Sequence, residues 1–180
     1  MWQGVSYGRH VHVTSMWRSG GLGLCCPYEF NCNRERAVSR KVVLITGGSR
    51  GIGAAAARLL SAEGWAVAVN YRADTAAALA TVATIEAAGG EAFAVKADTG
   101  SASDIAAMFK AVDAKWGRLD ALVNNAGVVG PRGPFDAVAL DEMERVLRVN
   151  VIGYMLCAQA ALPRLIRAGG GSIVNVSSGS

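Results

Sequence analysis

The stretch that decides the fold is KVVLITGGSRGIG, residues 41–53. Its first part, residues 42–46, is an apolar run rich in β-branched side chains, which is typical of a strand buried on both faces. Glycine-rich residues 47–53 follow, and then the alanine-rich residues 54–60, which favour a helix. A strand, a glycine turn and a helix N-terminus form a pyrophosphate site, because free N–H groups and the helix dipole attract negative charge. A tight turn that only packs strand on helix would give the same pattern, so the rest of the chain must decide.

The chain beyond residue 53 repeats this alternation of strand and helix. Strands are predicted at residues 66–70, 92–96, 119–123 and 172–176, and helices at residues 74–88, 103–116 and 140–168. Strands that alternate with helices of this length indicate right-handed βαβ units around a parallel sheet. The predicted fold is therefore α/β, a Rossmann-type doubly wound parallel sheet in one domain over residues 41–180.

Length and composition fit this fold. The 180 residues are 52% hydrophobic and 18% charged, which is typical of a folded α/β protein and not of a disordered one. No run approaches the roughly 18–20 continuous apolar residues of a membrane span. The net charge of +4 belongs to residues 1–41, which carry six Lys and Arg against two Glu, whereas residues 42–180 carry twelve charges of each sign. We therefore expect neither a nucleic-acid nor a membrane partner.

Residues 1–40 show neither helical nor alternating periodicity. They are predicted to be a disordered extension, or spurious sequence upstream of the true start. Residues 1–28 lack acidic side chains, which leaves a transit peptide as a further interpretation. A secretory signal is not indicated, because the apolar residues 20–26 are too short and too rich in glycine, so we expect a cytoplasmic protein.

The four cysteines do not indicate a metal site. Cys25, Cys26 and Cys32 match no metal-ligand spacing, so no metal is expected. Cys157 lies in a helical apolar pattern and is predicted to be a small core residue.

The residues that follow the predicted strands are small, polar or glycine. Ligands of open parallel sheets bind beyond the carboxyl ends of the strands, so these residues are the candidates for a binding site. They are residues 47–53, 70–72, 98–99, 124–127 and 177–178.

Four motifs among these residues occur in the order of one known family. They are Thr46-Gly47-x-x-x-Gly51-x-Gly53, Asn124-Asn125-Ala126-Gly127, Asn150 within Val149-Asn150-Val151-x-Gly153, and the strand that ends in Ser177-Ser178. Residues 41–180 thus resemble the short-chain dehydrogenase/reductase family, in the single-domain branch that includes 3-oxoacyl-acyl-carrier-protein reductases and glucose dehydrogenases. The resemblance implies a sheet of order 3-2-1-4-5-6-7, of which this sequence contains about five of the seven strands.

The resemblance also implies a role for individual residues. Asn150 would hold a water in a proton relay, and Ser178, rather than Ser177, would hydrogen-bond the substrate oxygen. Asp98 would accept a hydrogen bond from the adenine amino group. Taken singly, these residues are more simply a helix-surface Asn and residues of turns and strand ends. The expected cofactor-binding residues are Gly47, Ser49, Arg50, Gly51, Ile52, Gly53, Asn70, Tyr71, Arg72, Asp98, Thr99, Asn125, Ala126 and Gly127.

The end of the second predicted strand indicates the cofactor. A site selective for NAD(H) places an acidic residue there to accept from the ribose 2′-hydroxyl. The sequence has Asn70-Tyr71-Arg72 at this point, with no carboxylate before Asp74. Arg50 and Arg72 are predicted to flank a 2′-phosphate, so NADP(H) is expected to be preferred over NAD(H). The alternative is that both arginines only face water.

The family's proton-transfer pair is missing from the sequence. The resemblance implies a tyrosine and, four residues later, a lysine, about a dozen residues beyond Ser178. Tyr154 is followed at that spacing by Ala158, and Tyr71 by Thr75. The expectation is an NAD(P)(H)-dependent alcohol/carbonyl oxidoreductase truncated before this Tyr-x-x-x-Lys segment and inactive as it stands. A non-catalytic dinucleotide-binding module, or a truncated reading frame without activity, remains as an alternative.

Truncation would also leave apolar surface uncovered. Residues 173–176 are predicted to form an unpaired apolar edge strand, which favours aggregation. Met143, Leu147, Met155 and Leu162 are expected to be partly exposed on the long helix. The full-length protein is expected to be a dimer or tetramer that acts on a small carbonyl or alcohol substrate.

Overall fold

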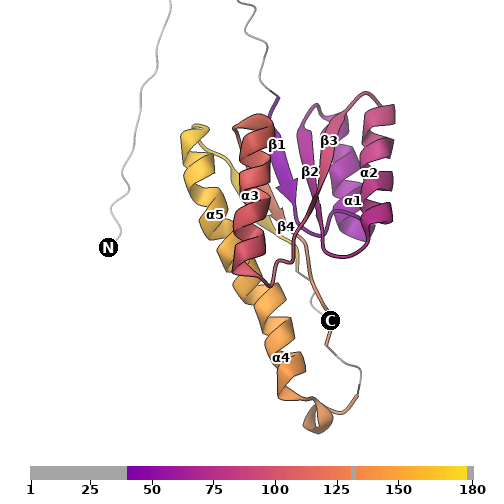
Figure 1. Ribbon diagram of the computed structural model, residues 1–180, viewed down its shortest axis with the longest axis vertical. Coiled ribbons are helices and arrows are strands. Elements are labelled where there is room, and N and C mark those ends of the chain that lie inside the picture. The colour runs from indigo at the N-terminus through magenta and orange to yellow at the C-terminus, as the bar shows by residue number, and fades with distance from the viewer. Residues whose placement is uncertain (1–39, 131–132, 178–180) are drawn as a thin grey trace, which may run out of the picture. The chain divides into compact units, whose positions relative to one another are not determined.

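A computed structural model describes residues 40–130 and 133–177. Its centre is a parallel sheet of five strands in the order β3-β2-β1-β4-β5, as predicted (Figure 1). The predicted extension lies outside the described residues, except for Arg40. The strands are β1 (Val42–Ile45), β2 (Ala66–Tyr71), β3 (Glu91–Lys96), β4 (Ala121–Asn124) and β5 (Ser172–Asn175).

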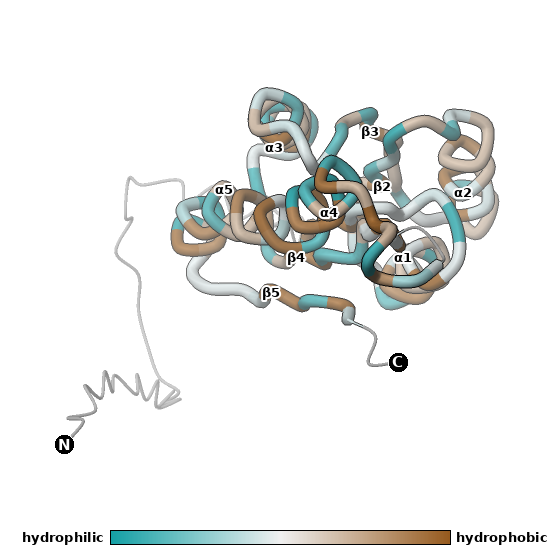
Figure 2. Tube along the Cα trace, turned by 90° about the horizontal axis from the view of Figure 1, so that it is seen from below, coloured by the Kyte–Doolittle hydropathy of each residue, from teal (hydrophilic) through white to brown (hydrophobic). Residues whose placement is uncertain are grey.

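Helices cover both faces of the sheet in a doubly wound arrangement. α1 and α2 lie on one face, and α3 and α5 lie on the other (Figures 1 and 2). The helices are α1 (Gly51–Ala62), α2 (Thr75–Ala87), α3 (Ala102–Trp116), α4 (Leu140–Leu147) and α5 (Gly153–Arg167), with a short 3₁₀ helix at Phe135–Ala137.

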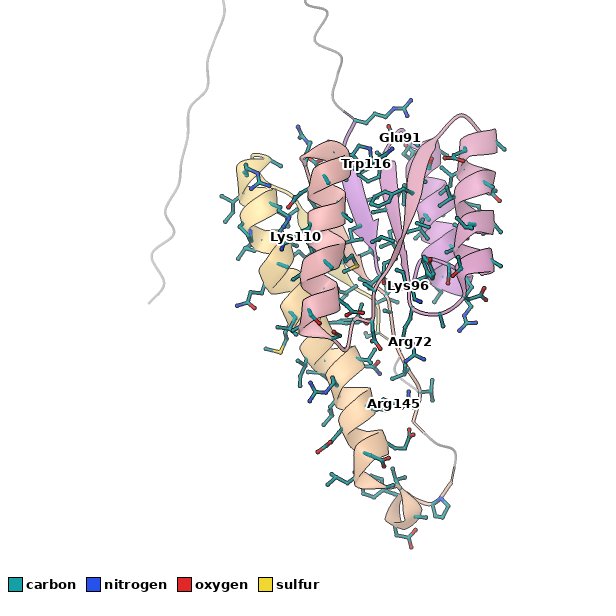
Figure 3. All side chains as sticks on the ribbon, in the orientation of Figure 1. Arg72, Glu91, Lys96, Lys110, Trp116 and Arg145 are labelled. Carbon is teal, nitrogen blue, oxygen red and sulfur yellow. The ribbon has the colours of Figure 1, made fainter. Side chains whose placement is uncertain are left out.

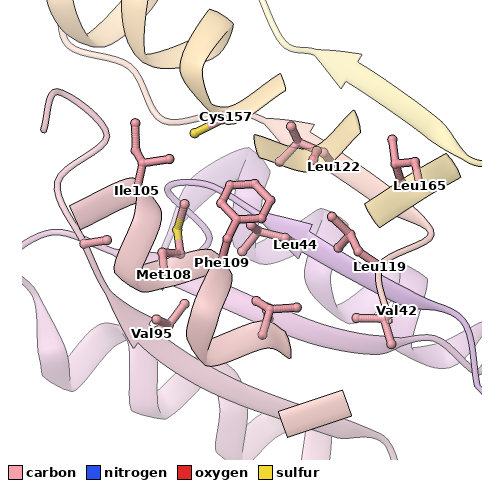
Figure 4. Close-up of a cluster of buried hydrophobic side chains, with 14 of the residues drawn as sticks. Val42, Leu44, Val95, Ile105, Met108, Phe109, Leu119, Leu122, Cys157 and Leu165 are labelled. Carbon is pink, nitrogen blue, oxygen red and sulfur yellow. The ribbon is translucent and has the colours of Figure 1, made fainter. Parts of the chain in front are cut away.

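The core consists of two apolar layers, one on each face of the sheet. Val42 and Leu44 of β1 point toward α3 and α5, whereas Val43 and Ile45 point toward α1 and α2. All four side chains are at most 2% exposed, because a central parallel strand is covered on both faces. Figure 4 shows the first layer, in which Phe109 and Met108 of α3 meet Leu44, Leu122 and Cys157. Burial raises the pKa of the Cys157 thiol to about 12, so this cysteine is a core residue, as predicted.

Side chains at the helix ends explain where the helices begin. The Asp74 carboxylate accepts a hydrogen bond from the Ala77 N–H at 2.9 Å and caps α2. Ser101 caps α3 by accepting from the Asp104 N–H. α1 begins at Gly51, three residues before the predicted start, so the end of the glycine motif forms its first turn.

The helix predicted at residues 140–168 contains an irregular turn. α4 and α5 are joined without interruption by a π turn at Arg148–Ile152. By length and composition alone, the run Leu140–Arg167 is long and apolar enough to cross a membrane, a test that core helices also pass. Cys157, Ala161 and Leu165 of α5 are buried in the core, so this part of the run packs on the sheet.

Apolar side chains remain exposed along the run and on β5. Leu147, Leu162 and Met155 are 53–67% exposed, as predicted from the sequence. All four residues of β5 are exposed, and Figure 2 shows this strand at the edge of the sheet. Within the described residues, β5 pairs with β4 alone.

The amino ends of the strands are held by one buried carboxylate. Asp120 is 7% exposed and accepts from the Val42 N–H at 2.9 Å and from the Arg118 guanidinium. Burial raises the pKa of Asp120, but these donors outweigh it and hold the pKa below its usual range.

Candidate cofactor-binding site

A cavity of about 310 Å³ opens at the carboxyl ends of the strands. It lies where the strand order reverses on either side of β1, which is the usual ligand position in such sheets. Its lining comes from the turns after β1, β2, β3 and β4 and from the π turn. The lining residues are Gly47, Ser49, Arg50, Asn70, Tyr71, Arg72, Ala73, Asp74, Ala97, Asp98, Thr99, Asn125, Ala126, Gly127, Val128 and Val149.

Two positions in the glycine turn tolerate no side chain. Gly47 has φ of 62°, and a Cβ there would lie 2.9 Å from the Ala126 Cα. A Cβ on Gly53 would collide with the Gly47 carbonyl oxygen and the Asn125 amide nitrogen. These glycines therefore let β1, α1 and the turn after β4 approach one another closely.

The N-terminus of α1 is open toward a ligand. Arg50 is its N-cap residue, and no side chain makes a capping hydrogen bond there. The first N–H groups of a helix have no partner within the helix, and the helix dipole adds partial positive charge. With Ser49 and Arg50 in the cavity wall, this end of α1 suits a phosphate group.

Asn70 locks the second strand to the glycine turn. Its side chain is 1% exposed, and its Oδ1 accepts from the Gly47 N–H at 3.2 Å. Its Nδ2 donates to the carbonyl oxygens of Val95 and Ala97 at 3.3 and 3.1 Å. The Asn70 side chain thus reaches the cavity wall but uses its polar atoms to hold the ends of β1, β2 and β3 together.

The turn after β4 is joined to β1 in a similar way. Thr46 Oγ1 accepts from the N–H groups of Asn125 and Ala126 at 2.9 and 3.0 Å. The Asn125 Nδ2 donates back to the carbonyl oxygens of Thr46 and Gly47. This reciprocal bonding sets Asn125, Ala126 and Gly127 against the glycine turn.

Charged groups gather at the outer end of the cavity. Arg50 and Arg72 are both exposed. Figure 3 shows Arg72 at the carboxyl ends of the strands, whereas Glu91 and Trp116 lie at the other end of the sheet. The Arg72 guanidinium lies 3.9 Å from Asp98 Oδ2, while Asp98 Oδ1 accepts from the Gly100 N–H at 2.8 Å. The second carboxylate, Asp74, is occupied in capping α2.

A further carboxylate, Asp104, shapes the loop that carries Asp98 and Thr99. Its Oδ2 accepts from the Asp98 N–H at 3.0 Å, and its Oδ1 accepts from the Ser101 hydroxyl at 2.9 Å. The Asp98 N–H and the Ser101 hydroxyl hold the pKa of Asp104 below its usual range. The loop after β3 is thereby fixed by its own side chains.

Asn150 occupies the π turn and faces the loop after β4. Its Nδ2 donates to the Val128 carbonyl at 2.8 Å, and its Oδ1 accepts from the Val128 N–H at 2.9 Å. This paired bond ties the long helix to the residue that follows the Asn124–Gly127 motif.

The structure brings eleven of the fourteen expected cofactor-binding residues into one cavity wall. Gly51, Ile52 and Gly53 form the first turn of α1 instead, with Ile52 68% exposed and Gly53 buried beneath the turn. Ser178 lies outside the described residues. Sequence reasoning missed Ala73, Asp74, Ala97, Val128 and Val149, and for all of these except Asp74 the signal was their position directly beside an expected site residue. The described residues hold no group of three or more potential metal ligands.

The doubly wound sheet, the glycine turn and the open helix terminus are features of the dinucleotide-binding fold class. The Asn125 bonds hold the turn after β4 against the glycine turn. A family model described as short chain dehydrogenase matches residues 41–180. The chain belongs to this family.

Several relatives match over the same part of the chain. The chain is 45% identical over 140 residues to an uncharacterized oxidoreductase, YgfF, of Escherichia coli, covering 76% of this chain and 57% of that protein. It is 39% identical over 142 residues to a 3-oxoacyl-[acyl-carrier-protein] reductase of Synechocystis, covering 79% and 57%. The chain therefore spans little more than half the length of these relatives.

Solved structures agree with the fold. A metagenomic short-chain oxidoreductase in complex with NADP superposes with a TM-score of 0.74 at 40% identity, covering 78% of this chain and 63% of the other. A short-chain dehydrogenase from Burkholderia cenocepacia, also in complex with NADP, has a TM-score of 0.71 at 41% identity, covering 77% and 55%.

Proposed function

We propose that this chain is the cofactor-binding part of an NADP(H)-dependent oxidoreductase that acts on a carbonyl or alcohol substrate. The observation that carries the proposal is the open N-terminus of α1 in one cavity wall with Arg50 and Arg72. The bound nicotinamide would supply hydride exchange at its C4 atom. The protein would orient it and stabilise the charge that develops on the substrate oxygen.

The cavity fits the phosphates of a dinucleotide. The pyrophosphate would lie over Ser49, Arg50 and the first turn of α1, where N–H groups face the ligand. Gly47 and Gly53 let the backbone segments that border this space pack closely against one another. Asn125, Ala126 and Gly127 would line the ribose. Asp98 would accept from the adenine amino group, with the Thr99 backbone beside it.

The preference for NADP(H) rests on charge at the end of β2. Arg72 follows β2 directly, and its nearest carboxylate, Asp98, is 3.9 Å away, which is a loose ion pair. A 2′-phosphate would offer Arg72 and Arg50 a doubly charged partner in place of this contact. Asp74 also lines the cavity, but it lies three residues beyond the end of β2 and its Oδ1 caps α2, so it is not placed as the strand-end acidic residue of an NAD(H) site.

Matched ligands test the preference on the 180-residue chain. Calorimetry should give tighter binding of NADPH than of NADH, and of 2′,5′-ADP than of 5′-ADP, by about tenfold or more for charge-assisted bonds. The 2′-phosphate is the feature that distinguishes each pair. A tenfold preference for NADH would contradict the assignment, and no binding of either coenzyme would contradict the proposed function itself.

The proton-transfer step has no residue of the family's kind in this sequence. None of the four tyrosines is followed four residues later by lysine. The Tyr154 hydroxyl donates to the Val176 carbonyl at 3.2 Å, and burial raises the pKa of this tyrosine, which makes it a poorer proton donor. We infer that the 180 residues bind the coenzyme and do not oxidise NADPH with carbonyl substrates at a useful rate.

Two further residues keep the roles that their motifs imply. Ser178 would hydrogen-bond the substrate oxygen. The Asn150 amide is bound to Val128 at both ends, which leaves the second lone pair of its Oδ1 and the backbone of the π turn to hold a relay water.

The second candidate function is a dinucleotide-binding module without catalysis. It is favoured by the same cavity, because binding requires no tyrosine or lysine. Reading the coding DNA beyond Ser180 separates the two candidates: a Tyr-x-x-x-Lys within about 20 codons supports the oxidoreductase. The same proposal includes a small-molecule carbonyl or alcohol substrate. It also includes a dimer or tetramer for the full-length protein and a cytoplasmic location.

A further inference from the structure

Thr81 lies on α2, outside the cavity wall, yet its side chain reaches the glycine turn. It is 5% exposed, and its Oγ1 lies 3.1 Å from the Ser49 carbonyl oxygen and 3.1 Å from the Ala77 carbonyl oxygen. A threonine hydroxyl has one proton to donate. The carbonyl of the glycine turn therefore competes with the helix's own carbonyl for this proton.

Thr84 on the same helix shows the bond that a threonine makes without such competition. It is exposed, and its hydroxyl donates to the Ala80 carbonyl, four residues back, at 2.8 Å. The corresponding bond of Thr81 to Ala77 is longer, at 3.1 Å, and equal in length to its bond to Ser49. The Thr81 proton is thus shared between the helix and the turn.

The bond to Ser49 fixes one peptide plane of the turn. The described chain has no cis peptide bond, so the Ser49 carbonyl and the Arg50 N–H point in opposite directions across their planar peptide. Because Thr81 holds the carbonyl toward α2, the Arg50 N–H is held away from α2. Arg50 is also the N-cap residue of α1 and makes no side-chain capping bond, so this peptide lies directly at the open helix terminus.

We propose that Thr81 is a positioning residue for the cofactor site, acting through the Ser49 carbonyl on the Ser49–Arg50 peptide. The inference rests on the proposed function, since it concerns how the same cavity receives a phosphate. α2 begins just after Arg72, so Thr81 also links the two segments that carry the arginines of the proposed 2′-phosphate site. The residue touches neither the cavity nor a ligand.

Three variants of the 180-residue chain test this role by calorimetry with NADPH. Thr81→Val removes the hydroxyl at nearly constant volume, Thr81→Ser keeps it, and Thr84→Val removes a hydroxyl of the same helix that does not reach the turn. We expect Thr81→Val to weaken NADPH binding about tenfold, the factor that one lost buried hydrogen bond produces. Thr81→Ser and Thr84→Val should stay within about twofold of the unmodified chain, because neither loses that bond.

A second readout does not depend on a ligand. Hydrogen exchange of the amides at residues 49–52 should be faster in Thr81→Val than in Thr84→Val, because the peptide loses its anchor. Thr81→Ala serves the same comparison if the valine variant does not fold. The inference would be overturned if Thr81→Val, or Thr81→Ala in its place, left both NADPH binding and amide exchange unchanged. It would also be overturned if Thr84→Val weakened NADPH binding as much as Thr81→Val. Failure of the unmodified chain to bind either coenzyme would instead remove the proposed function, and this inference with it.

Discussion

The hydroxyl oxygen of Thr46 accepts a hydrogen bond from the Asn125 N–H at 2.9 Å, although the two residues lie 79 positions apart. Thr46 is 1% exposed at the end of β1, and Asn125 begins the turn after β4. The bond joins the two strand ends between which a dinucleotide would bind. In the other direction, the Asn125 Nδ2 donates a hydrogen bond to the Thr46 carbonyl oxygen at 2.9 Å.

Thr46→Val should lower the free energy of unfolding by about 2 kcal/mol, because two partly buried N–H groups lose their acceptor. Urea unfolding followed by circular dichroism measures the change. Thr46→Ser keeps the oxygen and should cost about 1 kcal/mol or less. Equal losses in both variants would show that the methyl group, and not the hydroxyl, matters.

Gly53→Ala should destabilise the domain by about 3 kcal/mol or more and abolish coenzyme binding, because its Cβ would meet backbone and the Asn125 amide. Gly51→Ala is the matched control. Gly51 has φ of 55° but open space around a Cβ, so only backbone strain of about 1–2 kcal/mol is expected there. Thermal melts compare the stability of the two variants, and calorimetry with NADPH measures binding by Gly53→Ala. A smaller loss of stability at Gly53 than at Gly51 would contradict the close packing described.

Arg72→Gln should weaken NADPH binding by about tenfold to a hundredfold and leave NADH binding nearly unchanged, because only NADPH carries the 2′-phosphate. Arg58→Gln removes the same charge from an exposed position of α1 outside the cavity wall. It should leave both affinities within about twofold, since a surface charge contributes little. Loss of NADH binding in Arg72→Gln would point to a role other than phosphate recognition.

The Asp120 carboxylate makes stability depend on pH in the acid range. Its pKa in the folded chain is below the unfolded value of about 3.9, so its contribution is present above that value and is lost as pH falls through the folded pKa. Asp120→Asn should cost about 2 kcal/mol at pH 7 and less near pH 3. Urea midpoints at the two pH values measure this. A pH-independent cost would show that the negative charge of Asp120 does not stabilise the fold.

Asn150→Asp should loosen the loop after β4, because a carboxylate cannot donate to the Val128 carbonyl. Hydrogen exchange at the Val128 amide should change only modestly, since the Oδ1 bond to it can persist. Asn150→Leu removes both bonds and should speed exchange at Val128 by about tenfold. Equal exchange in all three proteins would show that the paired bond does not hold the loop.

The positions of the strands could be predicted because each is a distinct apolar run in the sequence, whereas their order in the sheet was implied by the family resemblance. Strand boundaries that depend on contacts with residues distant in the sequence could not be predicted. Asp120 was expected inside the fourth strand, but its carboxylate binds the Val42 N–H and the Arg118 side chain, and β4 begins one residue later. The π turn at Arg148–Ile152 was also missed, because one additional residue hardly changes the helical period of a long apolar pattern.

The site was predictable where motif residues themselves line the cavity. Gly47, Arg72 and Asp98 follow their strands within two residues, so the topology brings them together at one edge of the sheet. Thr81 and Asp104 act on the site through single hydrogen bonds to backbone groups. No spacing rule connects Thr81 with Ser49, 32 residues before it, so only the folded chain shows that contact.

The π turn at Arg148–Ile152 contains one residue more than an ordinary α-helical turn, within an otherwise regular helix. Removing a single residue from Arg148–Ile152 would convert the π turn into an ordinary α-helical turn and leave α4 and α5 in nearly the same relative orientation. The Asn150 amide would leave the π turn from which it reaches the Val128 backbone, while Leu147 would keep its side of the molecule. A single codon deletion would therefore act locally, on the contact between the long helix and the loop after β4.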